Sequence, residues 1–132
     1  MFSMQKRPVI MFVDDEEIIL TSLKSQVKKY FGSEFRYETA SDAEEAYEII
    51  DELIQEDTPI LIIVSDWLMP KIKGDEFLKG VHKKFPGILK IILSGHADKS
   101  LVDSLSEEIP LYAHLRKPWE EKELVELIQK AK

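Results

Sequence analysis

Two apolar runs of the sequence are each followed directly by acidic residues. Asp14 and Asp15 come after the run Val9–Val13, and Asp66 comes after the run Ile60–Ser65. Short apolar runs of this kind are typical of buried strands in a parallel sheet. If these strands lie side by side, the carboxylates meet at one edge, where they repel one another unless a cation joins them. The acidic residues therefore predict a magnesium site.

A hydroxyl group and an ammonium group follow two further apolar runs. Ser94 comes after the run Ile88–Leu93, and Lys117 comes after the weaker run Leu111–Arg116. Both groups can hold phosphate oxygens, the serine through a hydrogen bond and the lysine as a point charge. Together with the carboxylates, they predict a magnesium-assisted phosphoryl site in which Asp66 is the candidate nucleophile.

Each of these residues also has an ordinary structural interpretation. An aspartate after a strand commonly caps a helix, Ser94 precedes Gly95 as in a turn, and a single lysine usually faces solvent. The shared position at strand ends favours the functional interpretation. In open parallel sheets, ligands bind outside the carboxyl ends of the strands.

The elements that position these residues alternate regularly along the chain. Strands are expected at residues 9–13, 35–39, 60–65, 88–93 and 111–115, and helices at about 14–31, 42–54, 75–84, 98–106 and 118–128. Such alternation indicates a parallel sheet with right-handed crossovers and helices on both faces. The sequence therefore predicts an α/β fold with a doubly wound, five-stranded parallel sheet in a three-layer sandwich. We expect one domain over residues 1–132, with a core at about 8–130 and no output domain in this chain.

The charge balance and the absence of cysteine limit the kinds of binding partner and site that this chain can have. The chain has 132 residues, 25 acidic against 18 basic, and a net charge of −7. This balance argues against nucleic-acid or anionic-membrane binding, which needs a positive field. The sequence has no cysteine, which excludes disulfides and thiolate metal sites and fits a cytoplasmic protein.

The motifs resemble those of the receiver domain of two-component response regulators. The matching segments are Val13-Asp14-Asp15-Glu16, Asp66-Trp67-Leu68-Met69-Pro70 with Gly74, Ser94-Gly95 and Lys117-Pro118. The resemblance extends over nearly the whole chain. It implies a flavodoxin-like (βα)5 fold with strand order 2-1-3-4-5. It also implies a cytoplasmic phosphorelay domain rather than an enzyme.

The resemblance further implies a role for each acidic residue. Asp66 would accept a phosphoryl group from a sensor histidine kinase or a phosphotransfer protein. Asp15, Asp66 and the backbone carbonyl of Leu68 would bind Mg²⁺, with Mn²⁺ as a substitute. Asp14 would act largely through water.

A switch is also implied by the resemblance. Ser94 and Lys117 would hold the phosphoryl oxygens, and the family usually has Tyr or Phe three positions before the lysine. This chain has His114 there, a polar ring that titrates near neutrality. Phosphorylation would pull Ser94 inward and rearrange the face made by the fourth helix, the fifth strand and the fifth helix. We expect His114 to swing inward as well, so that Ser94 and His114 form the switch. That face would contact a downstream protein or a fused output domain, or would pair two copies of the chain.

Three other functions fit parts of the pattern. A magnesium-dependent phosphatase with an aspartyl nucleophile typically places two aspartates one residue apart after its first strand, whereas Asp14 and Asp15 are adjacent. A flavodoxin-like nucleotide or flavin binder should have a phosphate loop rich in Gly, Ser or Thr instead of these acids. A receiver-like module that no longer takes phosphate is the third alternative, although all the required residue types are present.

Overall fold

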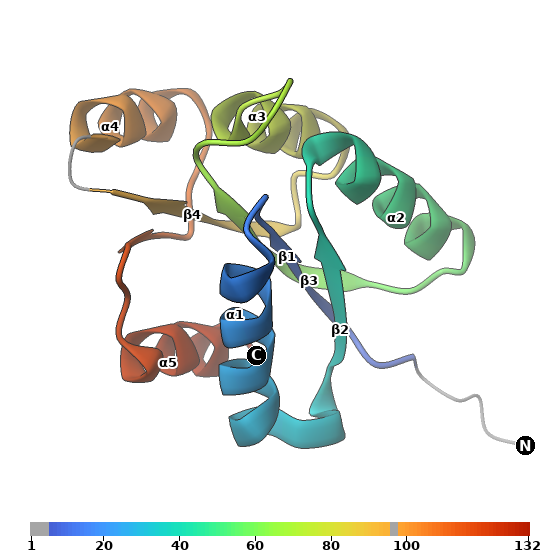
Figure 1. Cartoon of the computed structure of the whole chain (residues 1–132). Coiled ribbons are helices and arrows are strands. Elements are labelled where there is room, and N and C mark those ends of the chain that lie inside the picture. The colour runs from blue at the N-terminus through green and yellow to red at the C-terminus, as the bar shows by residue number, and fades with distance from the viewer. Residues whose placement is uncertain (1–5, 96–97) are drawn as a thin grey trace, which may run out of the picture.

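The computed structural model describes residues 6–95 and 98–132 (Figure 1). Its strands form one parallel, five-stranded sheet in the order β2-β1-β3-β4-β5, which confirms the predicted flavodoxin-like topology. The strands are β1 (Val9–Val13), β2 (Arg36–Ala40), β3 (Ile60–Asp66), β4 (Leu89–Ser94) and β5 (Ala113–Arg116).

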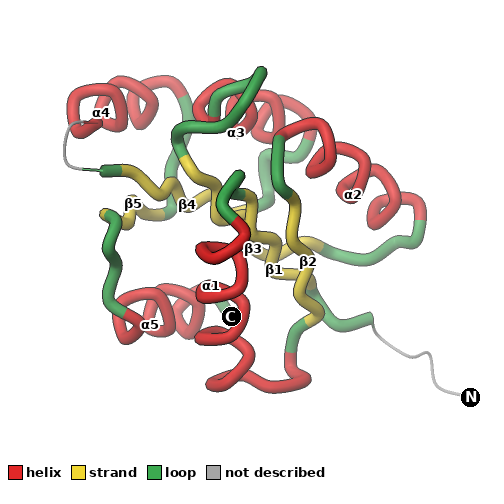
Figure 2. Tube along the Cα trace, in the orientation of Figure 1, coloured by secondary structure: helices red, strands yellow, loops and turns green. Residues whose placement is uncertain are grey.

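Helices cover both faces of this sheet. They are α1 (Glu17–Phe31), α2 (Ala43–Gln55), α3 (Gly74–Lys84), α4 (Lys99–Glu108) and α5 (Glu121–Ala131), with a short 3-10 helix, η1 (Gly32–Glu34), after α1. In Figures 1 and 2, α1 and α5 lie on one side of the sheet, and α2, α3 and α4 lie on the other. Among the described residues, no helix has the length and apolar character needed to cross a bilayer.

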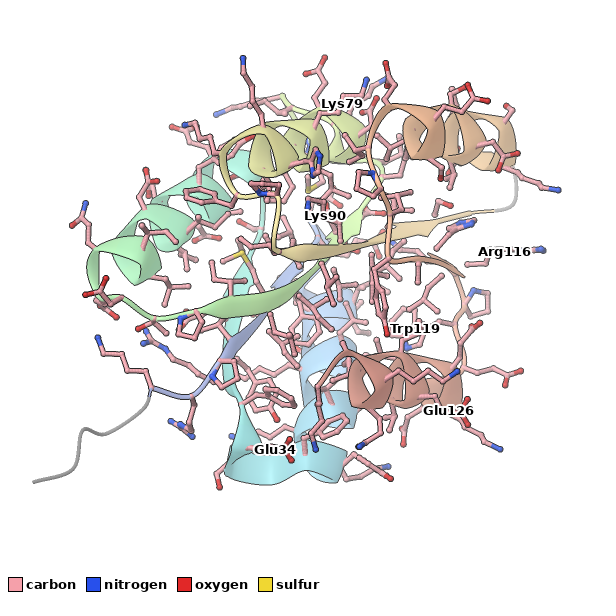
Figure 3. The ribbon with its side chains drawn as sticks, turned by 180° about the vertical axis from the view of Figure 1, so that it is seen from behind. Glu34, Lys79, Lys90, Arg116, Trp119 and Glu126 are labelled. Carbon is pink, nitrogen blue, oxygen red and sulfur yellow. The ribbon has the colours of Figure 1, made fainter. Side chains whose placement is uncertain are left out.

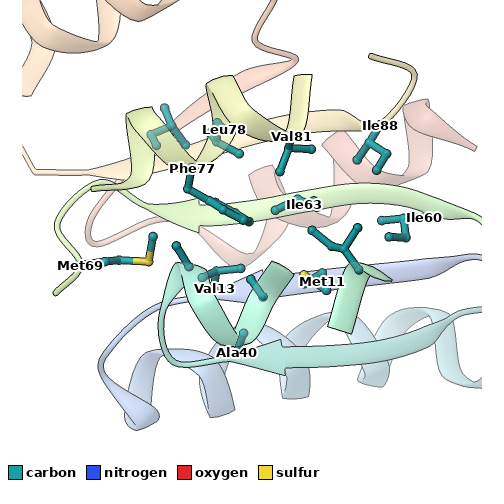
Figure 4. Close-up of a cluster of buried hydrophobic side chains, with 14 of the residues drawn as sticks. Met11, Val13, Ala40, Ile60, Ile63, Met69, Phe77, Leu78, Val81 and Ile88 are labelled. Carbon is teal, nitrogen blue, oxygen red and sulfur yellow. The ribbon is translucent and has the colours of Figure 1, made fainter. Parts of the chain in front are cut away.

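The side chains of each strand point alternately into two hydrophobic clusters. In β1, Met11 belongs to the cluster under α2, α3 and α4, whereas Phe12 belongs to the cluster under α1 and α5. Every residue of β1 is buried, as expected for a central strand that is covered on both sides. Figure 4 shows part of the first cluster, where Phe77 of α3 lies beside Ile63 of β3. The packed sheet thus gives the strand ends a fixed position.

The bounds of β2, β3, β4 and β5 differ from the predicted ones by one or two residues. β2 begins at Arg36, one residue later than expected, because η1 and its C-cap Phe35 occupy the preceding residues. β5 spans Ala113–Arg116 rather than 111–115. The strand pairing of β5 with β4 runs to Arg116, which is the partner of Ser94. Lys117 therefore follows the end of a paired strand, as the sequence predicts.

The predicted start of the last helix at Pro118 is wrong. α5 begins at Glu121, and Glu120 before it has an extended backbone, with φ −94° and ψ 132°. The indole Nε1 of Trp119 donates a hydrogen bond of 2.8 Å to Oε1 of Gln26 in α1. This bond ties the connection between β5 and α5 to α1, so these residues do not enter the helix.

A buried lysine lies in the core, remote from the carboxyl ends of the strands. Lys90 of β4 is 1% exposed and lies on the α3 side of the sheet (Figure 3). Its Nζ donates a hydrogen bond of 2.5 Å to the carbonyl oxygen of Ile88. Burial lowers the pKa of Lys90, since desolvation disfavours the ammonium form. This lysine has an apolar environment, unlike Lys117 described below.

Candidate functional site

The carboxyl ends of β1 and β3 bring three carboxylates together. Asp14, Asp15 and Asp66 each offer one oxygen, and these oxygens all lie within 4.8 Å of one another. Asp14 is fully buried, Asp66 is 5% exposed, and Asp15 faces solvent. The acidic cluster therefore lies where the strand-end pattern predicts it, with one side open to water.

Backbone hydrogen bonds between neighbouring strand ends fix this arrangement. The N–H of Trp67, directly after Asp66, donates to the carbonyl of Leu93 at 2.9 Å. The N–H of Lys117 donates to the carbonyl of Ser94, also at 2.9 Å. The backbones that carry the acidic, hydroxyl and ammonium groups are thus joined across the edge of the sheet.

Lys117 bridges two of the carboxylates. Its Nζ lies 3.0 Å from Oδ2 of Asp14 and 3.0 Å from Oδ1 of Asp66. Burial works against the ammonium form, but the hydrogen bonds to Asp66 and Asp14 outweigh it, so the pKa of Lys117 is raised. The lysine is therefore charged at neutral pH and is held inside the site.

The negative charge of the Asp66 carboxylate is only partly offset by Lys117. Burial raises its pKa to about 6, the hydrogen bond from Lys117 opposes this shift, and the negative charge of Asp14 adds to it. One lysine thus does not neutralise the acidic cluster. The donor set consists of oxygen atoms, which are the ligands that Mg²⁺ prefers, so the residues present fit this ion.

The first residue of α3 packs directly on the backbone of Asp66. The N–H of Gly74 donates to the carbonyl of Trp67 at 2.9 Å. A Cβ atom added at Gly74 would lie 2.0 Å from the carbonyl oxygen of Asp66. Leu68 belongs to the loop that this contact closes, and its side chain is 60% exposed. The glycine therefore allows α3 to approach the end of β3 and shape the loop after Asp66.

Gly74→Ala should lower the free energy of unfolding by about 2 kcal/mol, because the backbone oxygen that the new methyl group meets cannot move aside cheaply. Urea unfolding followed by circular dichroism measures the change. Gly87→Ala is the matched control, since a Cβ atom at Gly87 meets nothing within 4 Å. Equal stability of the two variants would show that the close approach at Asp66 is not tight.

Ser94 is engaged by the residue expected to act with it as a switch. The Ser94 side chain is 1% exposed, and its Oγ lies 2.6 Å from Nε2 of His114. The sequence suggested that these two residues act together but did not predict this hydrogen bond. The bond from Lys117 to Asp14 was not predicted either. His96, which the sequence places beside Ser94, lies outside the described residues.

The fold and the site define a flavodoxin-like α/β domain with an acidic pocket at the carboxyl edge of its sheet. The chain belongs to the response regulator receiver domain family, whose model matches residues 10–129. The resemblance drawn from the motifs is thereby confirmed, and the chain is a receiver domain of the two-component signalling class.

Individual relatives agree with this assignment. The hydrogenase transcriptional regulatory protein HoxA from Cupriavidus necator is 31% identical over 126 residues, which cover 96% of this chain and 24% of HoxA. The chain thus spans about a quarter of the length of this relative.

Solved structures show the same fold. A CheY-like response regulator receiver domain protein from Methanospirillum hungatei has a TM-score of 0.78 at 28% identity, covering 93% of this chain and 91% of that one. The signal receiver domain of an HD domain-containing protein from Pseudomonas fluorescens has a TM-score of 0.82 at 25% identity, covering 99% and 90%. One of these receiver domains therefore comes from a protein that also contains an HD domain.

Proposed function

We propose that this domain is a phosphoacceptor in a two-component phosphorelay and that Asp66 takes the phosphoryl group. The observation that carries the proposal is the buried Asp66 carboxylate, which lies 3.0 Å from the Lys117 ammonium and beside Asp14 and Asp15. The donor is a phosphohistidine on a sensor histidine kinase or a phosphotransfer protein. In this proposal the domain is cytoplasmic, because sensor kinases present their phosphohistidine in the cytoplasm.

The transfer uses the chain's own residues in defined roles. A carboxylate oxygen of Asp66 forms a bond to phosphorus while the bond from phosphorus to the donor nitrogen breaks, and the nitrogen keeps the electron pair. Lys117 is placed to bond an oxygen of the transferred group, and the Ser94 hydroxyl bonds another. The acyl phosphate is later hydrolysed by water. The domain thus modifies itself and does not turn over a separate substrate.

The acidic cluster would hold the metal ion that this chemistry needs. Asp15, Asp66 and the backbone carbonyl of Leu68 would bind Mg²⁺ or, as a substitute, Mn²⁺. When bound, the ion neutralises charge on the carboxylates and on the phosphoryl oxygens. Asp14 would act largely through water, and the contact of its Oδ2 with Lys117 supports this less direct role.

In this proposal, phosphorylation changes the surface that the domain presents to its partners. Ser94 and His114 act as the switch, His114 swings inward on phosphorylation, and the face formed by α4, β5 and α5 rearranges. That face contacts a downstream protein or a fused output domain, or pairs two copies of the chain. The small share of HoxA that the chain covers supports an output on a longer polypeptide. Association through this face stays a prediction.

The proposal is tested by intact mass after incubation with Mg²⁺ and acetyl phosphate. The native chain should gain one phosphoryl group, whereas Asp66→Asn, or the native chain with a chelator, should gain none. Asp51→Asn, at an exposed position of α2, is the matched control and should be modified normally.

Other results would support the alternatives. An adduct of equal size on Asp66→Asn would refute the assignment of the acceptor. Turnover of a small phosphomonoester that disappears in Asp66→Asn would favour the phosphatase alternative. Metal binding without any adduct would favour a receiver-like module that no longer takes phosphate.

A further inference from the structure

The Ser94 hydroxyl is bonded to a ring that can change its protonation state. Ser94 Oγ and His114 Nε2 are 2.6 Å apart, although the two residues come from neighbouring strands and are not register partners. The Ser94 side chain is buried, and the His114 ring is half-buried. A phenylalanine in place of His114 could not form this bond. The chain therefore has a polar contact inside the proposed switch.

We infer that protonation of His114 frees the Ser94 hydroxyl to bond a phosphoryl group on Asp66, so that a protonated His114 favours the phosphorylated form. His114 is a positioning residue in this inference, since it acts through Ser94. The inference rests on the proposed function of Asp66 and Ser94 and specifies how that function is regulated.

The number of hydrogens on each group limits the hydrogen bonds that it can donate. A serine hydroxyl has a single hydrogen, so it cannot donate to the ring and to a phosphoryl oxygen at once. When Nε2 of His114 is an acceptor, that hydrogen is directed to the ring. When the ring is protonated, Nε2 donates to Ser94 Oγ and leaves the hydroxyl hydrogen available to the phosphoryl group. The imidazolium also places a positive charge nearer to the transferred anion.

A neutral ring with the hydrogen on Nε2 allows the same hydrogen bonds but adds no charge. The part of the effect that depends on pH therefore reports on the imidazolium alone.

Charged groups from three elements surround the ring. Burial lowers the pKa of His114, and Arg116 on the same strand lowers it further, while Asp103 in α4, Asp98 just before it and Glu123 in α5 act in the opposite direction. Figure 3 shows Arg116 at the outer edge of the sheet. The resting ring is therefore mainly neutral at physiological pH. A phosphoryl group on Asp66 adds negative charge, so it should raise the pKa of His114.

The sign of the pH dependence follows by linkage. The phosphorylated form binds the His114 proton more tightly than the resting form does, so a fall in pH through the range between the two pKa values favours the phosphorylated form. Above both values the ring is neutral in either form and the effect vanishes. Burial raises the pKa of Asp66 to about 6, and the titration of this group has the opposite effect, because its carboxylate must be ionised to accept the phosphoryl group. This second titration cancels when native protein and a His114 variant are compared at each pH.

The test uses beryllofluoride with Mg²⁺ as a phosphoryl mimic, and Trp67 fluorescence as the signal for binding. The affinity of the native chain relative to His114→Phe should rise about tenfold between about pH 8 and about pH 5.5. His114→Gln keeps a polar partner for Ser94 without a titrating ring, so its affinity relative to His114→Phe should not change with pH. His96→Gln should retain the native profile, which excludes a contribution from the neighbouring histidine.

Ring proton shifts in NMR spectra give a second readout. The pKa of His114 should be higher with Mg²⁺ and beryllofluoride than without them. Parallel pH profiles for native protein and His114→Phe, or an unchanged pKa of His114, would overturn the inference while the Asp66 assignment stands. Failure of the native chain to bind beryllofluoride at every pH would instead contradict the proposed function.

Discussion

Lys117→Met should slow phosphorylation by acetyl phosphate about a hundredfold while the affinity for Mg²⁺ stays the same or rises. The ammonium group of Lys117 lies 3.0 Å from Asp66. In the proposed function it would stabilise charge on the transferred phosphoryl group, and the loss of one such donor commonly costs about this much. The same ammonium offsets part of the negative charge of Asp14 and Asp66. Its removal therefore leaves a more negative site for a cation.

Two measurements on the same samples separate these effects. The rate of adduct formation comes from intact mass, and the Mg²⁺ affinity comes from the fluorescence of Trp67, which follows Asp66 in the chain. Lys122→Met changes an exposed lysine of α5 and should match the native protein in both measurements. A parallel loss of rate and metal affinity in Lys117→Met would show that the lysine holds the site together and does not act on the phosphoryl group. An unchanged rate would remove Lys117 from the mechanism.

Asp66→Asn should raise the free energy of unfolding of the metal-free protein by about 2 kcal/mol at about pH 7. The folded state raises the pKa of Asp66 from 3.8 to about 6, chiefly through burial, so the ionised carboxylate is unfavourable there. The favourable contribution of the protonated group is fully present below about pH 4 and is lost as the pH rises through about 6. Asparagine removes the charge, and Lys117 keeps Asp14 as a partner.

Urea unfolding in the presence of a chelator measures this difference. The stability gain in Asp66→Asn should shrink as the pH falls from about 6 to about 4. Mg²⁺ should stabilise the native chain more than the variant, since an ion that binds only the folded state adds to its stability. Asp51→Asn in α2 serves as the control and should leave stability nearly unchanged. A less stable Asp66→Asn at neutral pH would mean that the carboxylate is satisfied in the metal-free site.

The sheet could be predicted from the sequence because its central strands are apolar throughout. Val9–Val13 was predicted with the observed bounds, since a strand buried on both faces appears as a continuous apolar run between polar residues. The strand order was implied by the family resemblance and did not follow from the runs themselves. Where an element is short or partly exposed, as in β5 (Ala113–Arg116), the pattern was ambiguous and the boundary was misplaced.

The convergence of the acidic residues followed from the same reasoning, since carboxyl ends of parallel strands share an edge. Hydrogen bonds within the site did not follow from it. That Lys117 contacts Asp14 as well as Asp66 depends on side-chain positions that strand periodicity does not determine. The start of α5 was misplaced because Trp119 bonds to Gln26, a tertiary contact that overrides the local preference of a proline for a helix start.

The pairing of Ser94 with His114 was likewise outside the reach of sequence reasoning. The strand register places Ile92 beside His114 and Arg116 beside Ser94, so the bond joins residues on the diagonal of the β4–β5 pair. A histidine three positions before a strand-end lysine was the one available signal. It identified the residue but not its partner.

The position of the phosphoryl group tests the central claim most directly. After the native chain reacts with acetyl phosphate and Mg²⁺, borohydride reduces an acyl phosphate on aspartate to homoserine, and peptide mass spectrometry locates the reduced residue. We predict that position 66 alone is converted, and that the conversion requires both the phosphodonor and Mg²⁺. Conversion at position 14 or 15, or a phosphoryl adduct that leaves Asp66 unreduced, would contradict the account.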